Sequence, residues 1–263
     1  MVVTDGGVRF DGRATGTPES TWAGADLPGR APALDLVGIR RLLVVSAHPD
    51  DETLGAGGLL ARGHASGAEV RVLVASDGEG SHPHSRTTTP AALGRRRRSE
   101  LTSATAHLAP GGAIDWLGLP DGQLGDREGD LTAEIGRWLG DGDAGTVVVS
   151  PWRADGHPDH EAVARSVARV LAGRGGAAVH LEFPIWAWLW AGPQDPRLQP
   201  RDLRVLRLTA AEQRAKARAI ADHRSQIAPL GDDPGDEAVL TPEFLDHFRR
   251  PWEIFLPAAG AVA

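Results

Sequence analysis

Short apolar runs alternate with longer segments of helical periodicity along most of this chain. The apolar runs are rich in Val and Leu, which is typical of strands buried in a sheet, and they occupy residues 40–47, 68–76, 114–119, 146–150 and 205–208. The segments between them carry apolar residues every three or four positions, which predicts helices over residues 55–67, 95–108, 131–139, 160–171 and 210–226. Strands that alternate with such helices are typical of βαβ units. The pattern therefore predicts an α/β fold with a mainly parallel sheet flanked by helices.

The first part of the chain differs from the rest. Residues 1–38 are rich in Gly, Pro and Thr and show little periodicity, so we expect an arm that packs on the domain and holds one short helix. Residues 39–263 show no break in composition, which predicts a single domain. Within it, residues 81–91 predict a loop that could act as a lid, and residues 229–243 predict a second loop.

Three tryptophans alternate near the end of an apolar and aromatic segment, at Trp186, Trp188 and Trp190. Because side chains two residues apart on a strand point to the same face, the alternation predicts a strand that presents aromatic rings to one side. Those rings could stack on a sugar, or they could pack between the core and the arm.

Composition excludes several classes of site and partner. The net charge of −7 and the pI near 5.8 argue against nucleic acid or an anionic membrane as a general partner. With 0 cysteines, a metal site must use His, Asp or Glu. No apolar run approaches the roughly 20 residues of a membrane span, and the N-terminus lacks a basic-then-apolar pattern. We therefore expect a cytoplasmic protein.

Polar residues follow the strand predicted at 40–47, in the order His48, Pro49, Asp50, Asp51 and Glu52. Ligands of open α/β sheets bind beyond the carboxyl ends of the strands, and imidazole and carboxylate are both zinc ligands. On its own, the turn is equally well explained by aspartates that cap a helix.

A second turn of the same kind follows the strand predicted at 146–150, with His157, Pro158, Asp159 and His160. Proline and aspartate are ordinary at a helix start, so this turn alone is a weak signal. Two His-Pro-Asp turns, each after a valine-rich strand, are a much stronger one. Their positions at one edge of a sheet predict a metal site.

A catalytic zinc site has about three protein ligands and an open position, and His48, Asp51 and His160 would supply two nitrogens and one oxygen. Asp50 would then lie beside the metal and could accept a proton from water. His157 could stabilise an oxyanion or protonate a leaving amine. Asp159 could hold His157 in one tautomer.

The paired turns resemble the PIG-L / LmbE-like family of zinc-dependent N-deacetylases. The resemblance covers roughly residues 40–226 and includes the segments 47–52, 55–58, 77–79, 97–100, 119–122, 157–160 and 223–226. It implies a Rossmann-like α/β sheet and hydrolysis of an amide, mostly the N-acetyl group of N-acetylglucosamine conjugates. It also implies zinc bound by His48, Asp51 and His160, with Asp50 as general base and His157 as the electrophilic partner.

The same resemblance suggests residues that contact the substrate. Arg97 matches a family arginine that binds sugar hydroxyls, Asp121 matches a family aspartate that faces the substrate, and Glu79 and His223 lie in matching segments. A surface salt bridge at Arg97 and a turn-forming role for Asp121 are the alternatives. Some family members have a tyrosine where this chain has Asp155, and the chain has 0 tyrosines.

We therefore expect a metal-dependent hydrolase that removes an N-acyl group, mostly acetyl, from an amino-sugar conjugate. Its metal would be Zn²⁺, with Fe²⁺ as an alternative because a site of two histidines and one aspartate tolerates both. A metal-dependent phosphohydrolase and a non-catalytic sugar-binding protein of the same fold are the competing hypotheses. The sequence leaves the substrate and the oligomeric state open.

Overall fold

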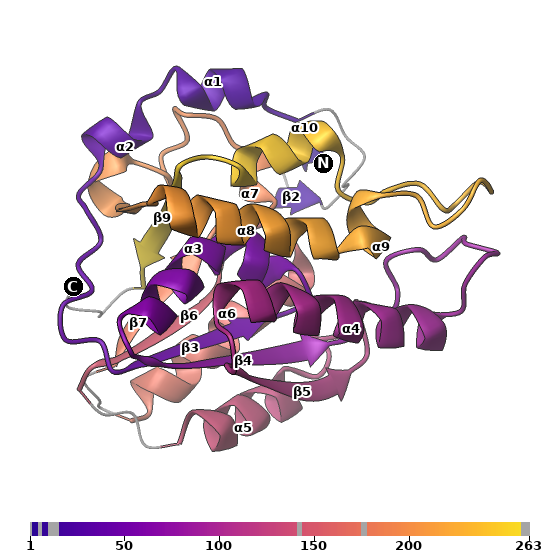
Figure 1. Ribbon diagram of the computed structural model, residues 1–263, viewed down its shortest axis with the longest axis horizontal. Helices are drawn as coiled ribbons and strands as arrows, with labels where there is room; N and C mark the ends of the chain where they lie inside the picture. The colour runs from indigo at the N-terminus through magenta and orange to yellow at the C-terminus, as the bar shows by residue number, and fades with distance from the viewer. Residues whose placement is uncertain (1, 5–6, 10–15, 141–143, 175–177, 259–263) are drawn as a thin grey trace.

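The protein is built on a central sheet with helices on both of its faces (Figure 1). The computed structural model describes residues 2–4, 7–9, 16–140, 144–174 and 178–258. The strands of the sheet are β3 (Arg41–Ser46), β4 (Glu69–Ser76), β5 (Ala113–Leu119), β6 (Thr146–Pro151), β7 (Val179–Phe183), β8 (Arg204–Arg207) and β9 (Trp252–Pro257). They lie in the order β5-β4-β3-β6-β7-β9-β8. The five strands from β5 to β7 are parallel, whereas β9 is antiparallel to both of its neighbours. The predicted α/β fold with a mainly parallel sheet is confirmed.

The long helices follow the strands as predicted, and most begin earlier than the periodicity suggests. They are α3 (Asp51–Ala65), α4 (Pro90–Leu108), α5 (Glu128–Leu139), α6 (Pro158–Ala172) and α8 (Ala210–Asp222). Proline occupies the first turn of α4 and of α6, where its missing N–H costs nothing. No helix within the described residues is long and apolar enough to cross a membrane.

Alternate residues of the inner strands face two separate cores. Leu42 and Val44 of β3 pack toward α3, α4 and α8, whereas Leu43 and Val45 pack toward α5 and α6. This alternation is what the two-residue period of a strand requires. Because both faces are covered, the inner strands are apolar at almost every position, as in other parallel sheets.

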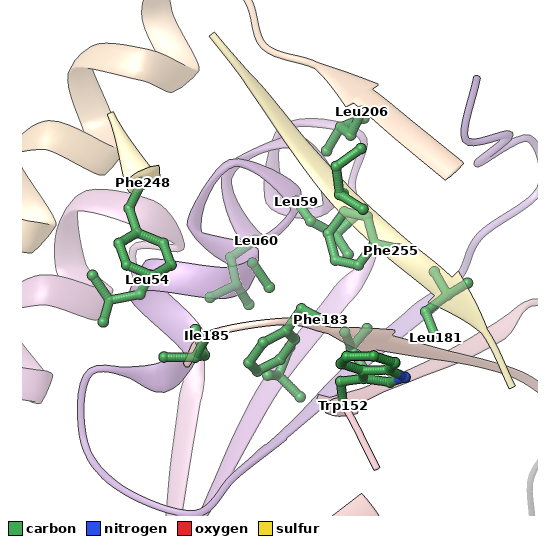
Figure 2. Packing of buried hydrophobic residues seen from close by; sticks show 14 of the residues in the cluster. Leu54, Leu59, Leu60, Trp152, Leu181, Phe183, Ile185, Leu206, Phe248 and Phe255 are labelled. Atoms are coloured by element: carbon green, nitrogen blue, oxygen red, sulfur yellow. The ribbon is translucent and has the colours of Figure 1, made fainter. Parts of the chain in front are cut away.

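Helix α3 lies close against the sheet, and this contact fixes the start of the helix. Figure 2 shows Leu54, Leu59 and Leu60 of α3 in the same cluster as Phe183 at the end of β7. A Cβ on Gly55 would overlap the Phe183 ring, so only glycine allows this approach. The helix thereby presents its N-terminal residues, including Asp51, at the edge of the sheet.

The strand predicted from the alternating tryptophans is wrong. Strand β7 ends at Phe183, and residues 187–190 form the short helix α7 (Ala187–Trp190). The three rings therefore point in different directions and pack separately. Trp188 packs edge-on against Trp22, with 4.8 Å between centroids, and the stacked pairs are Trp186 with Phe244 and Trp190 with Trp152.

The C-terminal segments also depart from prediction. The helix expected over 210–226 ends at Asp222, and α9 (Arg224–Ile227) follows after His223. The segment after residue 240 forms α10 (Pro242–Leu245), the 3₁₀ turn η2 (Asp246–Phe248) and then β9. Strand β9 was not predicted, and it adds an antiparallel strand between β7 and β8.

The first 38 residues hold more structure than one short helix. The described parts include the strand pair β1 (Val2–Thr4) and β2 (Gly7–Arg9), and the short helices α1 (Glu19–Ala23) and α2 (Leu27–Arg30). Trp22 of α1 is fully buried and donates a hydrogen bond from Nε1 to the carbonyl of Trp188. Glu19 forms an ion pair with the buried Arg250. The described residues 16–38 thus pack against the domain. The division into an arm and a single domain stays a prediction.

Candidate metal centre and active site

The two predicted turns meet at the carboxyl ends of β3 and β6, which are adjacent parallel strands. The chain leaves β3 for β4 on one side, whereas β6 lies on the other side. Such a point, where strand order reverses, is where open α/β sheets bind ligands. The sheet topology therefore brings His48, Asp50 and Asp51 close to His157 and His160.

Three of these residues form a group with the geometry of a metal site. His48, Asp51 and His160 each offer one ligand atom within 4.8 Å of the others. Nδ1 of His48 lies 3.7 Å from Asp51 Oδ2, and Nε2 of His160 lies 3.2 Å from Asp51 Oδ1. His160 Nε2 is buried and has no hydrogen-bond partner. A buried, unsatisfied nitrogen beside a carboxylate fits a metal ligand, and the group can hold a divalent metal.

The outward nitrogen of each candidate histidine ligand contacts a carboxylate. Nδ1 of His160 lies 2.7 Å from Asp155 Oδ2, and Nε2 of His48 lies 3.1 Å from Asp121 and 3.2 Å from Asp159. Partners of this kind orient metal-binding imidazoles and increase their basicity. Burial disfavours the protonated form of His160, but the nearby carboxylates of Asp51 and Asp155 raise its pKa to about 9. The carboxylates around the two rings therefore favour a cation at this place.

A second group also places ligand atoms within 4.8 Å of one another, and it consists of His48, His157 and Asp159. Both oxygens of its carboxylate are engaged, because Oδ2 and Oδ1 of Asp159 accept the backbone N–H groups of Gly122 and Leu124 at 2.8 and 3.0 Å, whereas Asp51 accepts its backbone hydrogen bonds on Oδ2 alone. The group of His48, Asp51 and His160 is therefore the better metal site.

Asp155 is a site residue for which the sequence predicted no role. It is fully buried, and besides His160 it accepts the backbone N–H groups of residues 185, 186 and 187 at 2.8, 3.0 and 3.1 Å. Three successive N–H groups at the start of α7 form a site for a carboxylate. Its place two residues before His157 could have indicated a role in the site. The backbone N–H groups that it binds, at residues 185–187, are too remote in sequence to be predicted from the turn.

Adjacent aspartates of the first turn have different surroundings. Asp51 Oδ2 accepts the backbone N–H groups of Ala47 and His48 at 3.1 and 2.9 Å. Burial opposes the charge of Asp51, but His160 and His48 outweigh it and hold the Asp51 pKa well below its usual range. Asp51 is thus a fixed anion, as a metal ligand must be.

Asp50 has a strained backbone and a raised pKa. Its φ of 118° is in the region that non-glycine residues rarely adopt, and such strain is frequent at functional sites. Burial and the nearby Asp51 raise the pKa of Asp50 to about 7, against the opposing charge of Arg97. Oδ2 of Asp50 lies 3.2 Å from Nη2 of Arg97. The carboxylate lies beside the candidate ligands without belonging to their group.

His157 is held in one tautomer, but by a different atom than expected. The backbone N–H of Asp159 donates to Nδ1 of His157 at 3.2 Å, so the neutral ring carries its proton on Nε2. The bonds of the Asp159 carboxylate go to His48, Gly122 and Leu124. Its expected role toward His157 is therefore corrected: the backbone, at the start of α6, orients the ring. Burial and the positive His160 and His48 keep the His157 pKa well below its usual value.

His48, Asp50, Asp51 and His157 line a cavity of about 490 Å³. The polar side chains of its wall are His48, Asp50, Asp51, Ser81, Arg97, Asp121, His157, Asp159 and Gln226. The apolar side chains are Leu54, Pro83, Pro158, Ile185, Trp186, Val239 and Leu240. The cavity thus lies directly over the candidate metal group and has the size of a small-molecule site.

Two of the four expected substrate-binding residues face this cavity. Arg97 is buried, so it is not the surface salt bridge that was its alternative, and it donates to the carbonyls of Pro49 and Gly78, both at 2.7 Å. Asp121 accepts the N–H of Gly80 at 2.9 Å. Both carry polar groups that can bind hydroxyls.

The other two are not among the residues that line the cavity. Glu79 accepts the backbone N–H of Asp121 at 3.0 Å, and so holds the turn behind the wall. His223 is buried, with Nε2 3.1 Å from Thr53 Oγ1. These contacts place their polar atoms behind the wall, and their role as substrate contacts stays a prediction.

The two predicted loops form the outer rim of the cavity. Residues 77–89 and 228–241 extend together beyond the ends of α4 and α9 (Figure 1). Thr87 hydrogen-bonds Asp236 across them, and the Gln226 side chain donates to Ser81 Oγ at 3.3 Å. The loop after β4 is therefore braced by the C-terminal part of the chain.

Comparison with known proteins identifies relatives of one kind. The family model described as GlcNAc-PI de-N-acetylase, PIG-L, matches residues 43–171. A 1D-myo-inositol 2-acetamido-2-deoxy-alpha-D-glucopyranoside deacetylase of Rhodococcus opacus is 36% identical over 138 residues, which cover 50% of this chain and 42% of the relative. The enzyme of the same name from Tsukamurella paurometabola is 39% identical over 51% of this chain and 43% of its own length. The chain thus spans less than half of each.

Solved structures share the fold at low identity. The zinc-inhibited form of a teicoplanin deacetylase is 18% identical, with a TM-score of 0.61 over 84% of this chain and 100% of its own. The N,N'-diacetylchitobiose deacetylase of Pyrococcus horikoshii is 20% identical, with a TM-score of 0.57 over 82% of each chain. The sheet and its flanking helices are therefore similar to those of sugar deacetylases.

Proposed function

Since its PIG-L domain at residues 43–171 makes this chain a member of the PIG-L family, we propose that it is a metal-dependent hydrolase of N-acyl amino sugars. The acyl group, acetyl or a larger one, would be removed from a conjugate of the N-acetylglucosamine kind; the names of the Rhodococcus and Tsukamurella relatives describe an acetamido sugar as their own substrate. The reaction adds water across the amide and yields a free amine and a carboxylate.

One observation carries this proposal. Asp50, a carboxylate that belongs to neither candidate metal group, faces the cavity between the His48–Asp51–His160 group and Arg97. A bound divalent metal would polarise the amide carbonyl and acidify a water. A protein that only binds sugars needs no free base there, whereas hydrolysis does.

The side chains divide the work of the reaction. Asp50 accepts a proton from the attacking water, and its pKa of about 7 suits a group that gains and returns a proton near neutral pH. The neutral His157 offers its Nε2–H to the oxyanion that develops on the carbonyl. The proton held by Asp50 then passes to the leaving amine as the C–N bond breaks. No tyrosine is available in this chain, so His157 acts without a phenol donor.

Arg97 and Asp121 would bind the sugar. Arg97 offers the N–H donors that Pro49, Gly78 and Asp50 do not take up, and Asp121 presents acceptors. Both line the cavity, within reach of Asp50 and His48 respectively. The amine end of the scissile amide would thus lie on the side of the sheet that carries β4 and β5.

We propose zinc as the metal, because two imidazoles and one carboxylate with room for water match catalytic zinc sites. Ferrous iron is the alternative for the same ligand set. The cytoplasmic location expected from the sequence stays a prediction.

The test is a screen for amine release from N-acetylated and other N-acylated glucosamine conjugates, with the metal content measured on the same preparation. We expect free amine from at least one member and a stoichiometric divalent metal, and we expect His160→Ala to lose both. Release of phosphate from phosphate esters without free amine would contradict the proposal. Full metal content in His160→Ala would remove His160 from the ligand set.

A further inference from the structure

The wall of the cavity changes from polar to apolar along the edge of the sheet. Two polar residues of its wall outside the metal group, Arg97 and Asp121, come from segments associated with β4 and β5, and Ser81 and Gln226 add polar atoms at the outer rim. Its apolar residues Ile185 and Trp186 follow β7, on the other side of β3 and β6. The candidate metal group lies between the two ends. A ligand that spans the cavity therefore meets hydroxyl-binding groups on one side and hydrocarbon on the other.

The apolar end is part of the main hydrophobic core. Leu54, Ile185 and Leu240 are 2%, 1% and 3% exposed and belong to the cluster that also contains Phe248 and Phe183. Figure 2 shows Leu54 and Ile185 close together, next to Phe248. Val239 is only partly buried and packs on the same cluster. Such a wall offers hydrocarbon surface, which favours an aliphatic occupant.

The apolar end begins at the reactive groups. The backbone N–H of Leu54 donates to the carbonyl of Asp50 at 2.8 Å, one helical turn away. Asp155 binds the N–H groups of Ile185 and Trp186 and also the ring of His160. One buried carboxylate thus fixes both a candidate metal ligand and the apolar wall. Whatever occupies this wall lies next to the bond that is cleaved.

An amide has two ends, and under the proposed function the amine end carries the sugar. If Arg97 and Asp121 bind that sugar, the acyl end points toward Leu54, Ile185 and Leu240. An acetyl group ends after one methyl, whereas the apolar part of the wall extends over Leu54, Ile185, Trp186, Val239 and Leu240. We propose that this apolar end is an acyl-binding site, and that the substrates of this protein are amino sugars N-acylated with an aliphatic chain longer than acetyl.

The test is a series of N-acyl glucosamines with acetyl, butanoyl, hexanoyl and octanoyl groups, assayed for amine release by the metal-loaded protein. Each methylene buried in the wall should raise kcat/KM about 4-fold until the cavity is filled. The fastest turnover with acetyl would overturn the inference while leaving the proposed deacylation intact. No amine from any member would overturn the proposed function, and this inference with it.

Val239→Trp should narrow the acyl site and lower the octanoyl-to-acetyl ratio of kcat/KM at least tenfold. Val239→Asn changes polarity with little change in size and should lower the same ratio, which keeps the test valid if the tryptophan variant does not fold. The matched control is Val37→Trp, since Val37 is 93% exposed, and it should leave the ratio unchanged. An unchanged ratio in both folded Val239 variants would contradict an acyl site at this wall.

A second series of substrates tests whether the apolar wall binds the aglycone of the sugar and not the acyl chain. N-acetylglucosaminides with alkyl aglycones of the same lengths should show no comparable rise in kcat/KM. A rise with aglycone length, together with indifference to acyl length, would show that the wall binds the aglycone and would overturn the inference.

Discussion

Oδ2 of Asp155 lies 2.7 Å from Nδ1 of His160, and both side chains are fully buried. The same carboxylate accepts three successive backbone N–H groups from the start of α7. A candidate metal ligand and a wall of the cavity are therefore held by one residue. Its bonds leave Nε2 of His160 directed at Asp51.

Asp155→Asn should weaken metal binding about 10- to 100-fold, because an outer partner of a histidine ligand sets its orientation and basicity. The side-chain NH₂ of the asparagine would also face one of the backbone N–H groups of residues 185–187, which in the wild type donate to the carboxylate. Metal affinity can be measured by competition with a chelator. Asp126→Asn is the control, since Asp126 is exposed. Unchanged metal affinity in a folded Asp155→Asn protein would show that the contact with His160 has no role in the site.

His157→Gln should lower kcat by about 10²–10³-fold, because removal of one oxyanion donor has this cost in other hydrolases. The KM should change little, since the contact strengthens only as the oxyanion forms. Steady-state kinetics on the best substrate separate the two constants. A raised KM with normal kcat would instead make His157 a residue that binds the ground state.

Lys216 and Glu253 should contribute strongly to stability. Helix α3 is kinked at Ala56, and Glu253 of β9 accepts the N–H groups of Gly58 and Leu59 beyond the kink, at 2.6 and 2.9 Å. Its charge is balanced by Lys216 at 2.7 Å, and both side chains are buried.

Glu253→Ala would leave a buried ammonium unpaired, and we expect it to lower the free energy of unfolding by about 3–5 kcal/mol. Urea unfolding measures this loss. The control is Glu134→Ala, which breaks an exposed ion pair with Arg137 and should cost less than about 1 kcal/mol. Equal effects of the two substitutions would contradict a special role for the buried pair.

We expect His180 to make the free energy of unfolding depend on pH. It is buried beside Ser150, at 2.9 Å, and burial together with Arg153 lowers its pKa to about 3. Its pKa in the unfolded chain is about 6.5, so between these values the unfolded state binds a proton that the folded state does not. Its contribution to stability is therefore complete above pH 6.5 and is lost as pH falls toward 3.

Between pH 7 and pH 5, the wild-type protein should lose about 2 kcal/mol more unfolding free energy than His180→Gln. Urea unfolding at both pH values gives the two differences. The comparison with the variant removes the contributions of other groups that titrate in this range. An identical pH dependence of the two proteins would mean that His180 titrates normally in the folded state.

The sequence predicted the parallel half of the sheet and the meeting of the two His-Pro-Asp turns. Valine-rich runs and helical spacing are local signals, and adjacent parallel strands bring their carboxyl ends together whatever the loops do. That geometry brings His48 and Asp51 close to His157 and His160, and the hydrogen bonds of the carboxylates then favour the group of His48, Asp51 and His160.

What the sequence did not reveal depends on contacts between remote segments. Strand β9 pairs with β7 and β8 only after the chain has closed, and residues 186–190 turn into a helix although their spacing suits a strand. The roles of Glu79 and Asp159 depend on which backbone N–H groups reach their carboxylates. Such preferences are set by tertiary structure, not by local propensity.

The central claim is that Asp50 moves a proton while its neighbour Asp51 binds the metal, and Asp50→Asn tests it most directly. The substitution keeps the size of the side chain and removes its basicity. The account predicts that metal content is unchanged while kcat for amine release falls by about 10²–10⁴-fold. Near-normal turnover by metal-loaded Asp50→Asn would contradict it.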